Sequence, residues 1–140
     1  MKLEDISSIF NNEGPFWKGG SGVCSRWKFY PPKPAVYLLI MNETLKWGNK
    51  ETNIIYIGST KHFGGIESNC RLWDYHTKAT QQEKRIVDHV VSLDAKKENP
   101  VKIHWTYEFP NNYTHKIYEK QLLKRFSQEH GKLPTLNRSL

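Results

Sequence analysis

Two short apolar runs that follow each other closely limit the fold of this chain more than any other feature of its sequence. Ala35–Met41 and Ile54–Ile57 each have the length of a buried strand, and Gly58 closes the second one. The polar segment between them, 42–53, contains Gly48-Asn49, which is typical of the turn in a β-hairpin. We therefore expect two neighbouring antiparallel strands at the centre of the fold.

One further strand and two helices are predicted after this pair. Apolar and polar residues alternate over Val101–Phe109, which predicts a strand with one exposed face. Apolar residues recur with helical spacing from the glycine pair Gly64-Gly65 to about His76, and again over Gln82–Leu93. The middle of the chain therefore alternates between helices and strands.

A third helix is predicted towards the end of the chain. Asn112 or Thr114 can cap its start, it runs to about His130, and Gly131 stands where a helix commonly ends. These elements together predict an α/β (α+β) fold, with a small central antiparallel three-stranded sheet flanked by helices.

The first part of the chain, residues 1–33, differs from the rest. Leu3–Phe10 has the pattern of a short helix, and Asn11–Pro15 breaks it. Aromatic residues then flank the glycine-rich stretch Gly19–Gly22. This strap either packs its aromatic side chains on the core or forms a loop that touches substrate. Residues 34–140 form the main unit, and a chain of 140 residues supports one compact domain.

The charge of the chain is basic and locally concentrated. Its formal net charge is +7 and its pI is near 9.4, which favours an acidic partner such as nucleic acid. Between residues 113 and 140, six basic residues stand against two acidic ones. The six are Lys116, Lys120, Lys124, Arg125, Lys132 and Arg138.

Neither a membrane nor a secretory location is indicated by the sequence. No stretch approaches the roughly 18 apolar residues that span a bilayer, and the first residues lack the basic start and apolar centre of a signal peptide. Cys24 and Cys70 have neither the spacing of a metal site nor a disulfide framework. We therefore expect a cytoplasmic protein with free thiols and no membrane partner.

Six features in a fixed order form a recognisable set. They are Ala35-Val36-Tyr37, Tyr56-Ile57-Gly58, Arg71, Tyr75, Glu119 and Asn137. The two tripeptides lie on predicted strands, and Glu119 lies in the third predicted helix. This order resembles the GIY-YIG nuclease superfamily over about residues 34–138. Ala35 replaces the first glycine of the family pattern, and the spacings between the tripeptides and from Tyr56 to Arg71 are longer.

The resemblance implies a GIY-YIG-like fold and an endonuclease that hydrolyses phosphodiester bonds in DNA, with one divalent ion, Mg²⁺ or Mn²⁺, per active site. It implies that Glu119 is the metal ligand. Arg71 would hold phosphate oxygens through its planar pair of donors, which lysine lacks. Tyr37 takes a base-like role, and Tyr56 or Tyr75 orients the water and the phosphate.

The remaining candidate residues have supporting roles. His76 competes with the tyrosines as the base, because neutral imidazole accepts a proton at pH 7 better than a phenol. Asn137 would anchor the cleft, and Gly58 would let the backbone approach a phosphate. The cations expected to contact the DNA backbone without reading its sequence are Lys61, Lys120, Lys124, Arg125, Lys132 and Arg138.

Several alternatives stay open at the level of sequence. The enzyme could be a sequence-specific restriction nuclease, with a homodimer cutting both strands, or a structure-specific repair nuclease. The chain could also be a catalytically silent nucleic-acid-binding module on the same fold. A third possibility is a nuclease that cuts only together with a protein partner.

Overall fold

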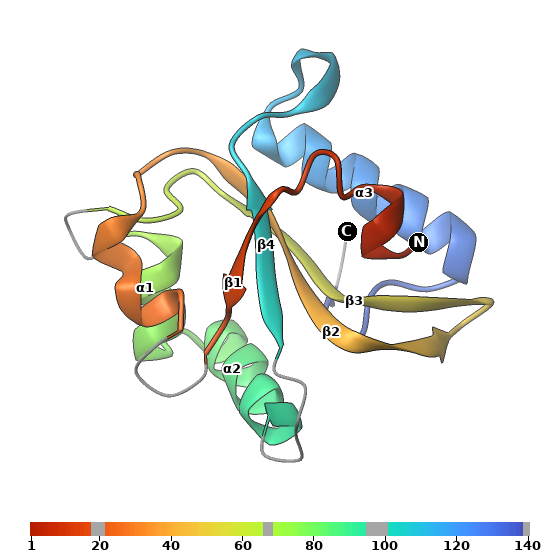
Figure 1. Cartoon of the computed structure of the whole chain (residues 1–140), viewed down its shortest axis with the longest axis horizontal. Coiled ribbons are helices and arrows are strands. Elements are labelled where there is room, and N and C mark those ends of the chain that lie inside the picture. Colours follow the sequence, from red (N-terminus) through yellow and green to blue (C-terminus); the bar gives the residue numbers. More distant parts are fainter. Residues whose placement is uncertain (18–21, 66–68, 95–100, 139–140) are drawn as a thin grey trace.

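The fold is a mixed α+β arrangement around a four-stranded antiparallel sheet, seen in a computed structural model that describes residues 1–17, 22–65, 69–94 and 101–138 (Figure 1). The strand order is β1-β4-β2-β3. The strands are β1 (Asn12–Pro15), β2 (Ala35–Trp47), β3 (Lys50–Thr60) and β4 (Lys102–Thr106). The α-helices are α1 (Arg71–Thr77), α2 (Gln81–Asp94) and α3 (His115–His130). Short 3-10 helices cover Leu3–Asp5 (η1), Cys24–Phe29 (η3) and Pro110–Asn112 (η4).

The prediction of three strands was wrong, because β1 adds a fourth at the edge of the sheet. Asn12 pairs with Trp105 and Gly14 with Ile103 of β4. The residues of β1 are poor strand formers and resemble a turn, but an edge strand tolerates Pro15, whose nitrogen cannot donate. The predicted N-terminal helix was also wrong, since only the single 3-10 turn η1 forms there.

The segment predicted as a polar connector is the outer half of a long hairpin. β2 and β3 continue pairing through Leu45 with Thr52 and Trp47 with Lys50. The turn predicted at Gly48-Asn49 is confirmed, with Gly48 at a φ of +65°. The Trp47 indole Nε1 donates to the carbonyl of Leu133 at 2.7 Å. The extra residues between the two tripeptides therefore extend the β2–β3 hairpin, and the hydrogen bond from Trp47 to Leu133 attaches this extension to the end of the chain.

The two faces of the sheet carry separate cores. Figure 1 shows α1 and α2 on one side of the sheet and α3 on the other. Side chains alternate along β2, so Tyr37 and Leu39 pack on the side of α1 and α2, while Val36 and Leu38 pack on the side of α3. This alternation fixes which residues of β2 and β3 can reach a given helix.

The boundaries of α2 and α3 agree with the prediction from the sequence, and that of α1 differs at its start. Thr114 caps α3, since its side-chain oxygen accepts from the Ile117 amide at 3.2 Å, and Gly131 ends the helix at a φ of +78°. α2 agrees with its predicted range. The predicted start of α1 was too early: the helix begins at Arg71, because Cys70 is extended and forms its N-cap position, and residues 66–68 of the predicted segment lie outside the described residues. Within the described ranges, no helix has the length and apolar character needed to cross a bilayer.

The β1–β4 pairing makes stability depend on pH. His104 of β4 is 7% exposed, its Nε2 lies 3.3 Å from a Glu13 carboxylate oxygen, and burial lowers its pKa. The unfolded chain therefore binds this proton more readily than the folded chain, so stability is lost as the pH falls through about 6.5. We expect the urea midpoint to decrease between pH 7.5 and 5.5, and His104→Gln to reduce that decrease. An equal decrease in both proteins would contradict this assignment.

Candidate active site

Three buried tyrosines from separate elements meet above the first turn of α1. The hydroxyls of Tyr37 on β2 and Tyr75 on α1 are hydrogen-bonded at 2.8 Å. The ring of Tyr56 on β3 lies with its centre 6.0 Å from that of Tyr37. Burial raises the pKa of all three phenols, most strongly for Tyr37 and Tyr75. All three hydroxyls therefore carry their protons at neutral pH.

Arg71 is the cation of this cluster. It is placed at the first position of α1, and its guanidinium lies among Tyr37, Tyr75, Glu83 and Tyr56. Its Nη1 lies 3.7 Å from Oε1 of Glu83, a carboxylate that is itself buried. The guanidinium is thus paired with a buried carboxylate, and its buried Nε–H has no hydrogen-bond acceptor among the described residues.

Glu119 of α3 lines a pocket of about 290 Å³ beside this cluster. Its Oε1 accepts from the Ser59 hydroxyl at 2.7 Å. Burial raises the pKa of the carboxyl, while the Ser59 hydrogen bond and then Arg71 oppose that rise. The other lining residues are Tyr56, Gln82, Lys116, Lys120, Leu123, Asn137 and Arg138. Three cations to one carboxylate give the pocket an excess of positive charge.

Tyr56 connects the pocket with the buried cluster. It lines the pocket, and its hydroxyl accepts from Gln82 Nε2 at 2.9 Å. Tyr37 is only 1% exposed and hydrogen-bonds Tyr75, so it stands behind Tyr56. Of the two tyrosines on the strands, Tyr56 therefore lines the pocket and Tyr37 does not.

The side-chain amide of Asn137 forms two hydrogen bonds with the backbone of β3 at the edge of the sheet, as a neighbouring strand would. Its Oδ1 accepts from the Ile57 amide at 3.0 Å, and its Nδ2 donates to the Ile57 carbonyl at 2.8 Å. The neighbouring amide of Leu136 donates to the carbonyl of Ile55 at 2.9 Å. Asn137 thereby fixes Ile57, the residue next to Tyr56 on β3. Both Asn137 and Tyr56 line the pocket.

Gly58 makes room for the tyrosines. A Cβ at this position would lie 2.6 Å from Cε2 of Tyr56 and 2.7 Å from Cζ of Tyr37. The role predicted for Gly58 was close approach of a phosphate, whereas in the structure the rings of Tyr56 and Tyr37 occupy that space. The second tripeptide therefore needs a glycine at this position so that Tyr37 of the first tripeptide can pack against it.

Gly58→Ala is expected to displace at least one of the two rings. Overpacking of this kind costs about 1–3 kcal/mol of stability. A shift of about 1 Å in a catalytic group lowers a reaction rate by roughly a hundredfold. Thermal unfolding and a cleavage assay measure the two effects separately. Unchanged values of both would show that the rings move aside freely.

The predicted DNA-contacting cations divide into two groups. Lys120 and Arg138 line the pocket together with Lys116, which the sequence analysis left out of the DNA-binding set. Lys61 lies close enough to His115, at the start of α3, to contribute to lowering the pKa of that imidazole, after burial and Lys116. These residues continue the positive surface from the pocket to the N-terminal end of α3.

The remaining cations and His76 lie elsewhere. Arg125 pairs with Glu129 at 2.8 Å, and the Lys132 ammonium lies 3.7 Å from the ring centre of Trp47. Lys124 is exposed on α3. His76 is also exposed, with its ring near those of Trp17 and Trp73 rather than turned inward like Tyr75. None of these four side chains lines the pocket around Glu119.

Several residues of the site were missed by the sequence analysis. Ser59, Gln82, Glu83 and Lys116 hold or surround the residues that were found. Ser59 directly follows the second tripeptide, so its position in the sequence is a signal that it belongs to the site. Gln82 and Glu83 had no such indication, because their roles depend on where the first turn of α2 meets β3 and α1.

A divalent ion is compatible with the donors in the pocket. No group of three or more His, Cys, Asp or Glu side chains suited to a metal occurs within residues 1–17, 22–65, 69–94 and 101–138. A hard ion such as Mg²⁺ keeps several waters and is often held by only one or two carboxylates. Glu119 fits that role, because it is an oxygen donor at a pocket with room for water.

Comparison of this chain with protein-family models, with curated proteins and with solved structures gave no match.

Proposed function

We propose that this chain is a metal-dependent endonuclease of the GIY-YIG type that hydrolyses phosphodiester bonds in DNA. One observation carries the proposal: a positively charged pocket contains a single carboxylate, Glu119, and borders a cluster of three buried tyrosines around the half-buried Arg71. Phosphate needs cations, and its hydrolysis needs stabilisation of the added negative charge. Both requirements are met by residues of one pocket and its wall.

The cations of the pocket bind and orient the substrate. Lys116, Lys120 and Arg138 attract the phosphate backbone, and such contacts act regardless of base sequence. A divalent ion at Glu119 would neutralise charge on the scissile phosphate and lower the pKa of a coordinated water. Arg71, beside Tyr56, adds a planar donor group suited to the charge that develops on phosphate oxygens.

The tyrosines act as hydrogen-bond donors in this proposal. Because burial raises the pKa of Tyr37 and Tyr56, neither phenol is an effective base at neutral pH. Tyr56 borders the pocket, so its hydroxyl positions the attacking water or a phosphate oxygen, while Gln82 holds that hydroxyl. Tyr37 and Tyr75 support Tyr56 and Arg71 from the buried side.

Supercoiled plasmid provides the test of the proposed function. With Mg²⁺ or Mn²⁺ the purified full chain should convert it to the open circular form, and chelation of the metal should stop the reaction. Binding without nicking in either metal would instead support a catalytically silent DNA-binding module. The positions of the cuts separate the biological roles, since fixed ends indicate restriction and cuts at branches or flaps indicate repair.

A further inference from the structure

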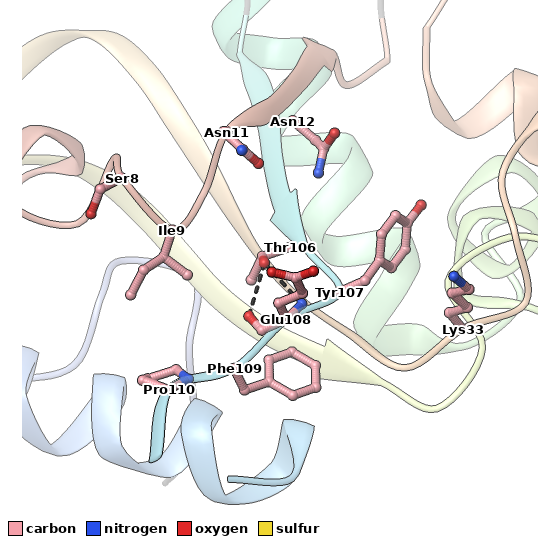
Figure 2. A pocket seen from close by; sticks show the side chains of 10 residues that line it. All are labelled: Ser8, Ile9, Asn11, Asn12, Lys33, Thr106, Tyr107, Glu108, Phe109 and Pro110. Carbon is pink, nitrogen blue, oxygen red and sulfur yellow. Dashed lines mark hydrogen bonds between the residues drawn. The ribbon is translucent and has the colours of Figure 1, made fainter. Parts of the chain in front are cut away.

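A second hollow lies where β4 leaves the sheet. Its volume is about 550 Å³, within the range of ligand pockets in proteins. It is formed by the segment before β1, by the exit of β4, and by Lys33 from the loop that enters β2 (Figure 2). It shares no lining residue with the pocket around Glu119. We call it the β4-exit hollow.

The walls of the β4-exit hollow are held by local hydrogen bonds. The Thr106 hydroxyl donates to the Glu108 carbonyl at 2.9 Å and accepts from the Glu108 amide at 3.1 Å. Figure 2 shows the side chains of Tyr107, Glu108 and Phe109 spread around this turn, with Asn12 opposite. Asn12 is fixed by donating to the Trp105 carbonyl at 3.3 Å. The hollow therefore has a defined shape.

The chemistry of the lining suits a nucleobase better than a phosphate. Lys33 and Glu108 balance each other, whereas the pocket around Glu119 has three cations to one carboxylate. Two partly buried aromatic rings, Tyr107 and Phe109, line the hollow, and the Lys33 ammonium lies 5.9 Å from the ring centre of Tyr107, so the hollow offers aromatic edges and one cation to a flat aromatic ligand. The amide of Asn11 is exposed and offers a donor and an acceptor, the pattern that the edge of a base requires.

The sheet fixes the spacing between two strand positions, Ser59 and Thr106, that belong to the two sites. Val36 of β2 pairs with Ser59 of β3 on one side and with Thr106 of β4 on the other. Ser59 holds Glu119, and Thr106 lines the β4-exit hollow. Two strand spacings amount to about 10 Å. One strand of B-form DNA advances 3.4 Å per nucleotide, so this separation corresponds to about three nucleotides.

We propose that the β4-exit hollow binds a base of the DNA strand, turned out of the stack about three nucleotides from the scissile phosphate. Glu108 selects a base with an exocyclic amino group, since an ionised carboxylate only accepts hydrogen bonds and the N4 group of cytosine donates. The inference rests on the proposed function for the identity of the substrate. It assigns base preference to a part of the chain outside the catalytic pocket.

Titration with free nucleosides tests the hollow independently of cleavage. Deoxycytidine and deoxyuridine differ at C4, which carries an amino group in one and a carbonyl in the other, and at N3, which carries a hydrogen only in deoxyuridine. Neither carries a phosphate that would draw it to the cationic pocket. In NMR spectra of the full chain, deoxycytidine should shift the signals of Asn11, Tyr107 and Glu108. It should bind about tenfold more tightly than deoxyuridine.

Two exposed side chains give the decisive variants. Glu108→Gln should bring the preference for deoxycytidine to within about twofold, because an amide both donates and accepts. Asn11→Ala should weaken both nucleosides, and Gln128→Ala, an exposed amide on α3, should change neither. A preference that survives Glu108→Gln, or shifts confined to residues around Glu119, would overturn the proposal.

The outcomes also separate this inference from the proposed function. Plasmid nicking without binding of either nucleoside would reject the β4-exit hollow as a base site and leave the nuclease intact. Selective binding of deoxycytidine without nicking would support the base site and reject the nuclease.

Discussion

Glu119→Gln is expected to lower plasmid cleavage by at least about a thousandfold while DNA binding is retained. The amide keeps the shape of the side chain and can still accept from Ser59, but it removes the negative charge that would hold a divalent ion. Because three cations of the pocket remain, affinity for DNA should stay the same or rise. Cleavage rates with Mg²⁺ and binding measured without metal give the two quantities.

A matched substitution controls for the loss of one negative charge. Glu51 is exposed in the β2–β3 hairpin and faces Lys46 across it, so Glu51→Gln should leave cleavage unchanged. Cutting by the cleanly purified Glu119→Gln protein at a rate near that of the unaltered chain would remove Glu119 from the proposed chemistry.

Arg71→Met is expected to lose both stability and cleavage, for separable reasons. Without the guanidinium, the buried Glu83 carboxylate loses its cation, which costs about 2–3 kcal/mol. Cleavage should fall by a factor of about a hundred to a thousand, as when one charge-stabilising donor is removed from an active site. Urea unfolding and cleavage rates measure the two losses.

Companion variants separate the two effects. In Arg71→Met/Glu83→Gln the uncompensated charge is gone, so most of the stability should return while cleavage stays low. Arg71→Lys keeps a positive charge but loses the planar pair of donors, so cleavage should remain at least tenfold reduced. Arg26→Met, at an exposed arginine on η3, serves as the control. Recovery of cleavage in the double variant would limit Arg71 to a structural role.

Elements with strong periodicity were predictable from the sequence. The strands β2, β3 and β4 and the helices α2 and α3 follow from apolar spacing, and Thr114 and Gly131 mark the ends of α3 where local chemistry places them. β1 was not predictable, because Gly14 and Pro15 disfavour a strand and adopt one only by pairing with β4. Tertiary contact decided the structure of that segment.

The residues of the candidate site were also predictable only in part. The tripeptides, Arg71, Tyr75 and Glu119 could be selected from the sequence, and the fold brings them to one pocket and its wall. The burial of Tyr37 behind Tyr56 was not foreseeable, because it depends on how α1 meets the sheet. Similarly, the sequence cannot show that Arg125 and Lys132 interact with Glu129 and Trp47 instead of lining the pocket.

Asn137 has a consequence for how two copies of this chain could associate. Exposed edge strands invite pairing with a strand from another molecule. The single amide group of Asn137 occupies both backbone groups of Ile57, so β3 offers no free ladder beside the pocket. A dimer that cuts both DNA strands would therefore assemble through another surface and leave this side of the sheet open to the substrate.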